Sequence, residues 1–523
     1  MTAFVLDPRA DYTPVLDATA AVAADGFIAN LNDDTKSNGF VMNDVVFRSL
    51  YDFGMFPDDT VYGPTAPATA RDDLLWYSTT DHILYYFELS SATWTPMTLA
   101  KSKEIFGFGE TGIISANRNY TVPTDFATPL DAENYLRKYR IASGVIVSVN
   151  VLAGSYNHAT YMQGHPNGDQ IKYIGIGYTG TAPTDADFTA TGYVAATIAA
   201  NAAANVAMLN GKYRVKISCT GTGLNLVGAN SIHMTDFLFV GPGRTVAGSI
   251  GADIDSSAYL YGCSFVAFEQ GVYNKGFLSF DKHIFVCDCQ NGSSAGFLSE
   301  SGTAIYETNG VVGAYNCNGF GVAGARGGAV TGYNVYARGN LQVGIGSNNG
   351  GAVFAAVQMV GTFNGMSGAS PATNGIVANF IGGNCQFQNN GQHGISAAIG
   401  GSTQLYTPTV SGNGNNGASA NTGAKIVLLN AVNVNNNTDH GITSASGSVV
   451  TLASGATVKN NGINGLNANG GRIDAPNVAT VPNTSTEIFA TNGGYILCAT
   501  AVGAPAFSPA VNTVGNFGSF IRN

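Results

Sequence analysis

The sequence predicts an all-β chain wound into a right-handed parallel β-helix, a solenoid of stacked coils. Two glycine-centred marks recur about every 24 residues between Gly271 and Gly494, a period typical of solenoid repeats. Short runs rich in Val, Ile and Thr lie between the marks and favour strands. Asn-Asn-Gly corners interrupt these runs and suit left-handed backbone angles. Frequent corners between brief strands indicate a coil and not a flat sheet.

Each predicted coil is defined by the two marks. The first is a glycine followed by an apolar residue, and the second is a glycine that opens a short apolar run. First marks are Gly271, Gly296, Gly321, Gly344, Gly368, Gly394, Gly441 and Gly465, and second marks are Gly302, Gly328, Gly351, Gly375, Gly401, Gly423, Gly447, Gly471 and Gly494. Leucine-rich repeats share this period, but leucine is scarce after Ser301. Stacked strands would pair about 4.8 Å apart, and corner asparagines would hydrogen-bond in ladders along the axis.

The N-terminal residues 1–115 lack the repeat and are predicted to form a separate β-rich region. Aromatic runs at 73–81, 82–87 and 91–96 are separated by polar turns and predict a small β-meander. Aromatic residues at this density usually form a core, and a carbohydrate platform is the alternative.

Residues 116–250 are predicted to hold a capping helix and irregular first coils. Thr128 can cap the helix, Pro129 suits its first turn, and Asp131 completes a capping-box variant. Such a helix would cover the open strand edge of the first coil.

Three further segments complete the predicted organisation. The alanine-rich stretch 193–209 contains two asparagines and predicts a surface helix, not a membrane span. The regular β-helix is predicted over 251–474, and 475–523 would close the far end.

Composition limits the partners of the chain. A net charge of −10 argues against nucleic acid, and charged residues are only 11% of the chain, so most of its polar surface is amide and hydroxyl. The seven cysteines are an odd number without zinc spacing and are predicted to be buried apolar side chains. We therefore expect no metal site and no cofactor. The N-terminus has no signal-peptide pattern, which predicts synthesis in the cytoplasm without membrane insertion.

Acid–base chemistry on a polysaccharide needs two carboxylates in one groove, and acidic residues gather between 253 and 307. One coil pitch would place three glutamates beside cations on the previous coil, which predicts ion pairs. These pairs are Glu300 with Lys275, Glu307 with Lys282 and Glu269 with Arg244. The catalytic candidates are the four aspartates left without an obvious partner: Asp253, Asp255, Asp281 and Asp288. Calcium binding and simple solvation are the alternatives for them.

Two histidines precede repeat glycines at matching places. His393 and His440 are therefore predicted to be corner residues and not ligands. The GxGxxG match at 319–324 and the GxSxG match at 292–296 lack the helix that each motif requires, so both are attributed to repeat corners.

Several segments resemble a known group of proteins. Residues 389–395 and 460–466, each followed by a glycine-opened strand, are similar to coils of pectin-lyase-like right-handed β-helices. Residues 152–156 and 165–171 resemble the first coil of bacteriophage tailspikes and tail fibres of this superfamily. Residues 73–77 with the later tryptophan look like a small module of phage tail proteins. Comparable head spikes occur on phage-like gene-transfer particles.

The resemblance implies a homotrimer on the surface of a virion or phage-like particle. Its N-terminal region would anchor it to other virion structural proteins, and its shaft would face bacterial surface polysaccharide, either capsule or lipopolysaccharide. Enzymatic tailspikes generally carry a carboxylate-rich groove, whereas acidic residues are few after Gly310. We therefore favour a receptor-binding spike that attaches without necessarily cleaving. A polysaccharide depolymerase, hydrolase or lyase, and a purely structural fibre are the alternatives.

Aromatic side chains exposed along the shaft could stack on sugar rings. The candidates for carbohydrate binding are Tyr306, Tyr315, Tyr333 and Tyr336.

Overall fold

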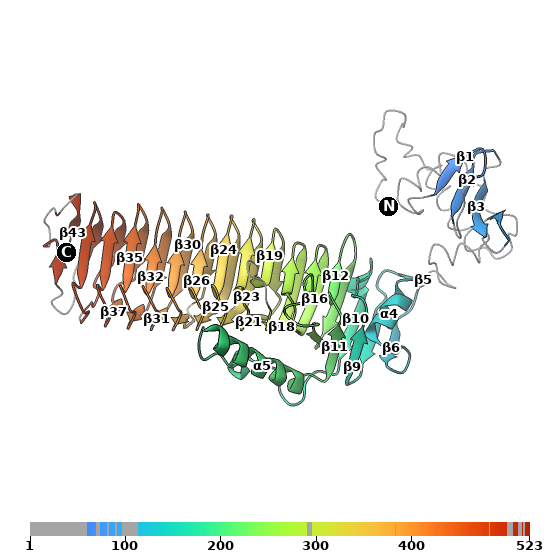
Figure 1. The fold of residues 1–523 in the computed structure, drawn as a ribbon, viewed down its shortest axis with the longest axis horizontal. Helices are drawn as coiled ribbons and strands as arrows, with labels where there is room; N and C mark the ends of the chain where they lie inside the picture. The colour runs from blue at the N-terminus through green and yellow to red at the C-terminus, as the bar shows by residue number, and fades with distance from the viewer. Residues whose placement is uncertain are drawn as a thin grey trace. The chain divides into compact units, whose positions relative to one another are not determined.

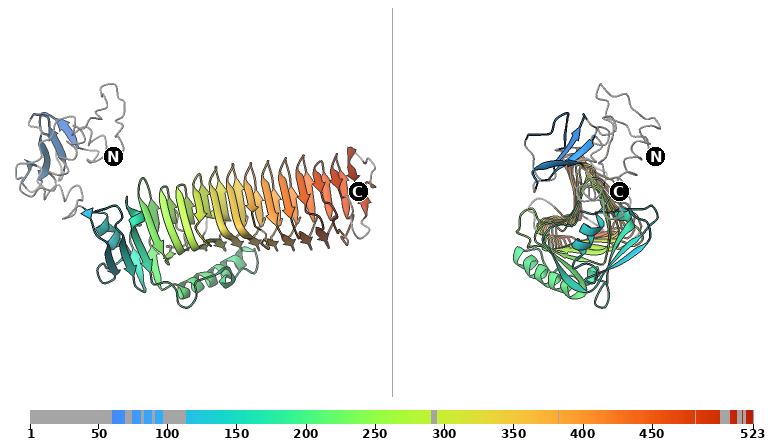
Figure 2. Two further views of the ribbon diagram at one scale, coloured as in Figure 1. Left: turned by 180° about the vertical axis from the view of Figure 1, so that it is seen from behind. Right: turned by 90° about the vertical axis from the view of Figure 1, so that its right-hand side faces the viewer.

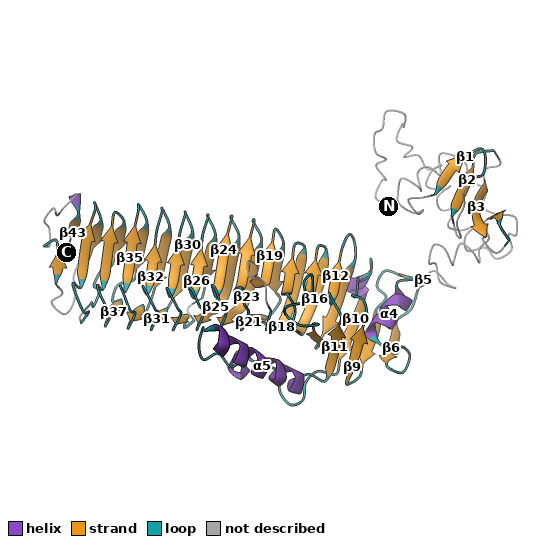
Figure 3. Cartoon of the chain, viewed as in Figure 1, coloured by secondary structure: helices purple, strands orange, loops and turns teal. Residues whose placement is uncertain are grey.

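The computed structural model describes most of the chain as two compact units. The described residues are 60–68, 74–80, 83–88, 91–96, 113–289, 295–381, 383–480, 482–498, 506–510, 515 and 518–522. The first unit contains Met1–Ala116 and Asn134–Val145, and the second contains Asn117–Glu133 and Ile146–Asn523. Most of the predicted anchoring region lies outside the described residues. Strands form nearly all of the regular structure in the described part (Figure 3).

The first unit contains a small sheet of four strands. They are β1 (Val61–Gly63), β2 (Leu75–Ser78), β3 (Ile83–Glu88) and β4 (Thr93–Pro96). The pairs β2–β3 and β3–β4 are antiparallel, which confirms the predicted β-meander, and β1 joins β2 in parallel. Leu75, Tyr77 and Leu84 are buried and form the core of this sheet, whereas the Trp76 ring stacks 4.9 Å from the half-buried Tyr85 ring. A separate two-stranded pair joins β5 (Ile113–Ile114) and β7 (Arg140–Ile141).

The second unit is a parallel β-solenoid, which confirms the predicted fold class (Figure 1). A 24-stranded sheet bends along its length into two faces, and a 13-stranded sheet makes a third. The bend is marked by register shifts, for example between Tyr261 and Cys263. Within these two sheets every strand pair among the described residues is parallel, as expected when each strand pairs with its counterpart one coil away.

Each regular coil crosses the three faces in order. The first face contains β6 (Arg118–Val122), β8 (Val147–Val151), β10 (Ile171–Gly175), β13 (Ser231–Thr235), β20 (Thr303–Tyr306), β27 (Ile376–Asn379), β30 (Ser402–Tyr406), β33 (Lys425–Leu429), β36 (Val449–Leu452), β39 (Arg472–Asp474), β41 (Tyr495–Leu497) and β43 (Phe520–Arg522). The second contains β9 (Gly154–His158), β11 (Val215–Cys219), β14 (Leu238–Val240), β21 (Val311–Tyr315), β28 (Gln386–Gln388), β31 (Thr409–Ser411), β34 (Asn433–Asn435) and β37 (Thr457–Lys459). Four long strands pass from the first face to the second: β16 (Ser257–Val266), β18 (Phe277–Cys287), β23 (Ala329–Arg338) and β25 (Ala352–Thr362). The third contains β12 (Leu224–Leu226), β15 (Ile250–Ile254), β17 (Gln270–Asn274), β19 (Ala295–Glu300), β22 (Phe320–Ala325), β24 (Ile345–Asn348), β26 (Ala369–Pro371), β29 (Ile395–Ala397), β32 (Ala418–Ala420), β35 (Ile442–Ala445), β38 (Leu466–Asn469), β40 (Ile488–Thr491) and β42 (Phe507–Ser508).

Columns of apolar side chains fill the interior of the solenoid. On the first face, Leu278, Ala304 and Val330 occupy equivalent register positions on successive coils and are fully buried. Neighbouring positions along each strand point outward, because side chains alternate between the two sides of a strand. The β-branched runs of the sequence therefore supply one interior residue at every second position.

A ladder of asparagines, buried except for the half-buried Asn483 at its end, runs along the corner between the second and third faces. From Asn340 to Asn461, the Nδ2 of each donates to the Oδ1 of the next, and the last bond goes to Asn483. The ladder contains Asn340, Asn364, Asn390, Asn413, Asn437, Asn461 and Asn483. Each of these amides also binds backbone groups, which confirms the predicted axial ladder and fixes the register of the coils.

The predicted capping helix is α4 (Pro129–Leu136). The backbone N–H of Asp131 donates to the Thr128 hydroxyl at 3.1 Å, and that hydroxyl donates to the Asp131 carboxylate at 2.8 Å. The N-cap prediction is therefore confirmed. Glu133, which is almost fully buried, accepts hydrogen bonds from the backbone N–H groups of Gln163 and Gly164. These bonds connect the helix to an early segment of the solenoid.

An excursion between β10 and β11 crosses the second face. It contains the short 3-10 turn η2 (Asp185–Asp187) and the helix α5 (Ala195–Lys212). Another 3-10 turn, η1 (Gly168–Gln170), lies just before β10 and outside the excursion. Figures 1 and 2 show α5 lying along the side of the solenoid, which confirms the predicted surface helix. The Phe188 ring stacks on the Tyr315 ring with centroids 3.6 Å apart. No helix in the described residues is long and apolar enough to span a membrane.

All seven cysteines are buried and free, as predicted. Burial raises the pKa of each Cys219, Cys263 and Cys385 thiol to about 12. These thiols therefore remain protonated and behave as small apolar side chains.

Candidate functional site

The four tyrosines proposed for sugar binding occupy different environments. Tyr315 is fully buried, because Phe188 of the excursion stacks on it and Asp185 accepts a hydrogen bond from its hydroxyl at 3.0 Å. The expectation that Tyr315 is exposed is therefore wrong. Tyr336 is half-buried beside the same excursion and donates to Gln358 at 3.1 Å. Tyr306 and Tyr333 are half-buried neighbours with ring centroids 6.1 Å apart.

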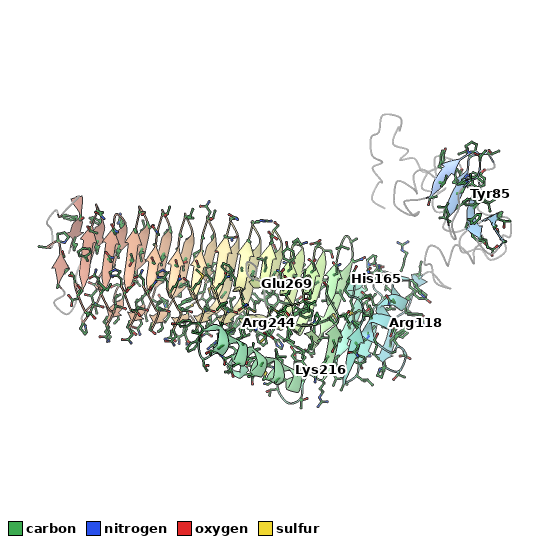
Figure 4. The ribbon with its side chains drawn as sticks, viewed as in Figure 1. Tyr85, Arg118, His165, Lys216, Arg244 and Glu269 are labelled. Carbon is green, nitrogen blue, oxygen red and sulfur yellow. The ribbon has the colours of Figure 1, made fainter. Side chains whose placement is uncertain are left out.

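Asp288 is held by an ion pair on the second face. Its Oδ1 lies 3.0 Å from Nη1 of Arg244. Burial raises the pKa of this carboxyl, and Arg244 opposes that effect. The predicted pair of Arg244 with Glu269 is wrong, because Glu269 instead accepts a hydrogen bond from the Gly248 backbone. Figure 4 labels Arg244 and Glu269, whose side chains have these separate partners.

Asp281 and Glu307 lie near one another at the edge of the first face. Asp281 accepts from the Asn309 backbone at 3.2 Å, and Glu307 accepts from the hydroxyls of Ser279 and Tyr261. The predicted pair of Glu307 with Lys282 is wrong. Lys282 stands at the bend with a left-handed backbone angle, φ +57°, and its Nζ binds both oxygens of Asp236 at 2.9 Å.

Asp253 and Asp255 belong to a charged row on the third face. Lys275 Nζ lies 2.6 Å from Asp255 Oδ1 and 3.7 Å from Asp253 Oδ1. The predicted pair of Lys275 with Glu300 is wrong, because the coil between Asp253 and its register partner Tyr273 is shorter than the average repeat. The short step brings the two aspartates within reach of the lysine. Neither aspartate is therefore without a partner.

The charged row continues onto the next coils through Tyr273 and Glu300. The Tyr273 hydroxyl donates to Glu300, and Arg326 Nη1 lies 2.6 Å from the other Glu300 oxygen. Burial, reinforced by the bond to Glu300, raises the pKa of Tyr273 to about 12. Lys275 also lies 4.7 Å from the centre of the Tyr273 ring. We define the charged row as Asp253, Asp255, Tyr273, Lys275, Glu300 and Arg326.

Asp253 is the most perturbed carboxyl of this row. Its Oδ1 is buried and makes no hydrogen bond within the described residues, because the 3.7 Å to Lys275 is an ion-pair distance only. Burial raises the pKa of Asp253, Lys275 opposes this, and Asp255 adds to it. A carboxyl of this kind is a candidate for proton transfer.

A groove of about 380 Å³ begins where the charged row ends. Leu298, Ala323, Gly346 and Ser370 follow one another in register along its floor. Because the last three are small, the floor is recessed relative to the larger side chains at its edges. Phe320, Val343 and Met366 supply apolar lining, whereas Glu300, Arg326, Asn348 and Asn349 supply charged and amide groups.

The four aspartates do not form one site. Asp281 is on the first face, Asp288 follows a second-face strand, and Asp253 and Asp255 are on or next to the third face. No group of three or more His, Cys, Asp or Glu side chains that could hold a metal occurs among the described residues. The groove was missed at the sequence level. Its only signal was the run of small residues at one register position, which is visible only once strand pairing is known.

No family model matches the chain, and no curated protein sequence matches it. The structure is similar to the Azotobacter vinelandii mannuronan C-5 epimerase AlgE6 A-module, with 12% identity and a TM-score of 0.29, over 72% of this chain and 91% of that chain. It is also similar to ORF18 of Geobacillus virus E2, with 10% identity and a TM-score of 0.18, over 89% of this chain and 72% of that chain. Both TM-scores are low, so the fold assignment rests on the strand pairing described above.

Proposed function

We propose that this protein is a receptor-binding spike of a virion or phage-like particle that attaches to bacterial surface polysaccharide. The observation that carries the proposal is the groove on the third face of the solenoid. It offers apolar surface from Leu298 and Phe320 beside amide groups from Asn348 and Asn349. Sugar rings need such a combination, because their ring faces suit apolar surface and their hydroxyls need several modest hydrogen bonds.

The groove is large enough to hold a short stretch of a polysaccharide. Its volume of about 380 Å³ lies at the low end of the range for ligand sites. A shallow site of this size would bind weakly. Several copies per spike and several spikes per particle would convert weak binding into firm attachment.

The direct test is adsorption of the purified full-length protein to bacterial cells. We expect binding to cells that carry capsule or complete lipopolysaccharide, and competition by polysaccharide extracted from those cells. Binding that is equal on cells stripped of both polymers would refute polysaccharide recognition. Particles that lack the protein yet adsorb normally would instead support the structural-fibre alternative.

We also propose that the spike is a homotrimer, as the resemblance implies, and that its first face contributes to the contact. Large apolar side chains are exposed there, among them Ile305 and Ile376 at 40% and Phe380 at 55%. Large apolar side chains left exposed to solvent along one face would be covered by a partner copy in such a trimer. Native mass spectrometry should give a trimer for the wild type and for Ile399→Lys, an exposed corner control. It should give smaller species for Ile376→Lys combined with Phe380→Lys.

Polysaccharide cleavage is a second candidate function, favoured by one observation. Asp253 combines a buried, unbonded carboxylate oxygen with a raised pKa, two coils from the groove. A protonated carboxyl is what a general acid needs. If cleavage occurs here, the purified protein should release oligosaccharides from the polymer it binds. Asp253→Asn should abolish release while leaving adsorption intact, and Asp281→Asn on the first face should not affect it.

A further inference from the structure

A second ladder runs along the same corner as the buried asparagines, three residues further in each coil. Its members follow Asn390, Asn413 and Asn437 in the chain and are His393, Asn416 and His440. The backbone N–H of Asn416 donates to His393 Nδ1 at 3.3 Å. The backbone N–H of His440 donates to Asn416 Oδ1 at 3.2 Å, and that of Asn464 donates to His440 Nδ1 at 3.3 Å.

The three side chains therefore make the same kind of hydrogen bond, but the acceptor is an amide oxygen in Asn416 and a ring nitrogen in the two histidines. Each accepts a backbone N–H from the next coil. The amide oxygen of Asn416 accepts at any pH. A histidine Nδ1 accepts only while it is unprotonated, which requires the ring proton to be on Nε2. We propose that His393 and His440 are acid-sensitive rungs, whose protonation at Nδ1 breaks their bonds to the next coil and loosens this corner as the pH falls.

The surroundings of the two histidines set the direction of the effect. Both side chains are half-buried, and burial lowers the pKa of each. Asp439 is the charged side chain that faces both of them in the described coils, and it opposes the shift. The folded pKa thus lies below the unfolded one, so the neutral rings stabilise the coils above the unfolded pKa, about 6.5. That contribution is lost as the pH falls toward the folded values.

A proton added at Nδ1 has a local consequence. The new N–H of His393 would face the Asn416 N–H at the distance of a hydrogen bond, so two donors would oppose each other. The same would occur between His440 and Asn464. The buried ladder beside them contains only amides and would not change. The corner of these coils should open while the rest of the solenoid stays folded.

Hydrogen–deuterium exchange of the full-length protein tests this inference. Peptides that contain Asn416 and Asn464 should lose about three- to tenfold in protection between about pH 7 and about pH 5, after correction for intrinsic exchange, since one hydrogen bond to each is lost. The His393→Asn, His440→Asn double variant copies the Asn416 rung and should keep its protection. Peptides around Asn340 and Asn364 are the internal control. An equal loss in wild type and double variant would overturn the proposal.

The variant Asn416→His provides an independent gain-of-function test. It places a third titratable acceptor in the same column, so protection of the His440 backbone N–H should become dependent on pH. A protection of that amide which stays constant down to about pH 5 in a folded variant would also overturn the proposal.

Discussion

The early and late coils of the solenoid are held together by different interactions. Late coils, from β24 onward, are held by the asparagine ladder and present small polar residues such as Ser396, Ser419 and Thr443 on the third face. Early coils contain large buried aromatics, including Phe265, Phe280 and Phe297, and carry the charged row on the same face. The groove lies where these two regions meet.

The two regions therefore differ in role: the regular late coils serve as a scaffold, and the irregular early coils carry the proposed site. Late coils repeat one corner with little variation, so their surface is uniform and nearly uncharged. Early coils vary in length and accommodate the excursion with α5. These departures from regularity bring Lys275 to the aspartates and leave a recess at Gly346. We infer that the ladder supplies stability and that the irregular coils supply the site.

The ladder should be the more sensitive region to mutation. Asn413 is fully buried, accepts from the backbone and side chain of Asn390, and donates to Asn437 and to the Phe387 carbonyl. Asn413→Ala leaves these groups without partners and should cost about 4 kcal/mol. Chemical denaturation would measure the loss. Asn415→Ala is the matched control, because that side chain makes no hydrogen bond in the described part of the chain, and it should change little.

The excursion should come next in magnitude. The Phe188 ring stacks on Tyr315 and meets Phe285 edge-on at 5.0 Å. Phe188→Ala should cost about 3 kcal/mol and make Tyr315 accessible to solvent. Thermal unfolding and tyrosine fluorescence quenching would detect both effects. Val194→Ala, an exposed position on the same excursion, should leave both unchanged.

The smallest expected effect is at the charged row, where a substitution should stabilise the fold, unlike the two destabilising substitutions above. Because burial raises the pKa of Asp253, the folded state holds this proton more tightly than the unfolded state. The ionised carboxyl therefore destabilises the fold at neutral pH, and this cost disappears as the pH falls through the raised value toward about 3.9. Asp253→Asn should raise the unfolding midpoint slightly at neutral pH and have less effect in acid. Asp255→Asn removes the partner of Lys275 at 2.6 Å and should not raise it.

The regular part of the fold was predictable because its causes are local and periodic. The first-mark glycines recur because the backbone at these positions lies against a neighbouring strand. A methyl group at Gly394 would overlap Val410, and one at Gly441 would overlap Val458. The corner asparagines recur because each bonds to its counterpart on the next coil. The spacing of glycines and asparagines in the sequence therefore predicts the coils directly.

The site was less predictable because it depends on departures from the period. An average coil length could not predict the partners of Lys275 and Lys282. One short coil places Lys275 beside the two aspartates, and a bend in the backbone directs Lys282 toward Asp236. The burial of Tyr315 depends on Phe188, which is remote in the chain. The recess at Ala323, Gly346 and Ser370 appears only when register is known. Small residues look alike in sequence whether they form a groove floor or a tight corner.

The central claim is that polysaccharide binds in the groove of the third face, and two tryptophan variants test it most directly. Ser370 lines the groove, and Ser419 occupies the same outward register column two coils later, outside it. Affinity for polysaccharide extracted from the adsorbing cells should be measured by calorimetry. Ser370→Trp should fill the recess and weaken binding at least about tenfold, whereas Ser419→Trp should bind as the wild type does. Wild-type affinity in both variants would contradict the account.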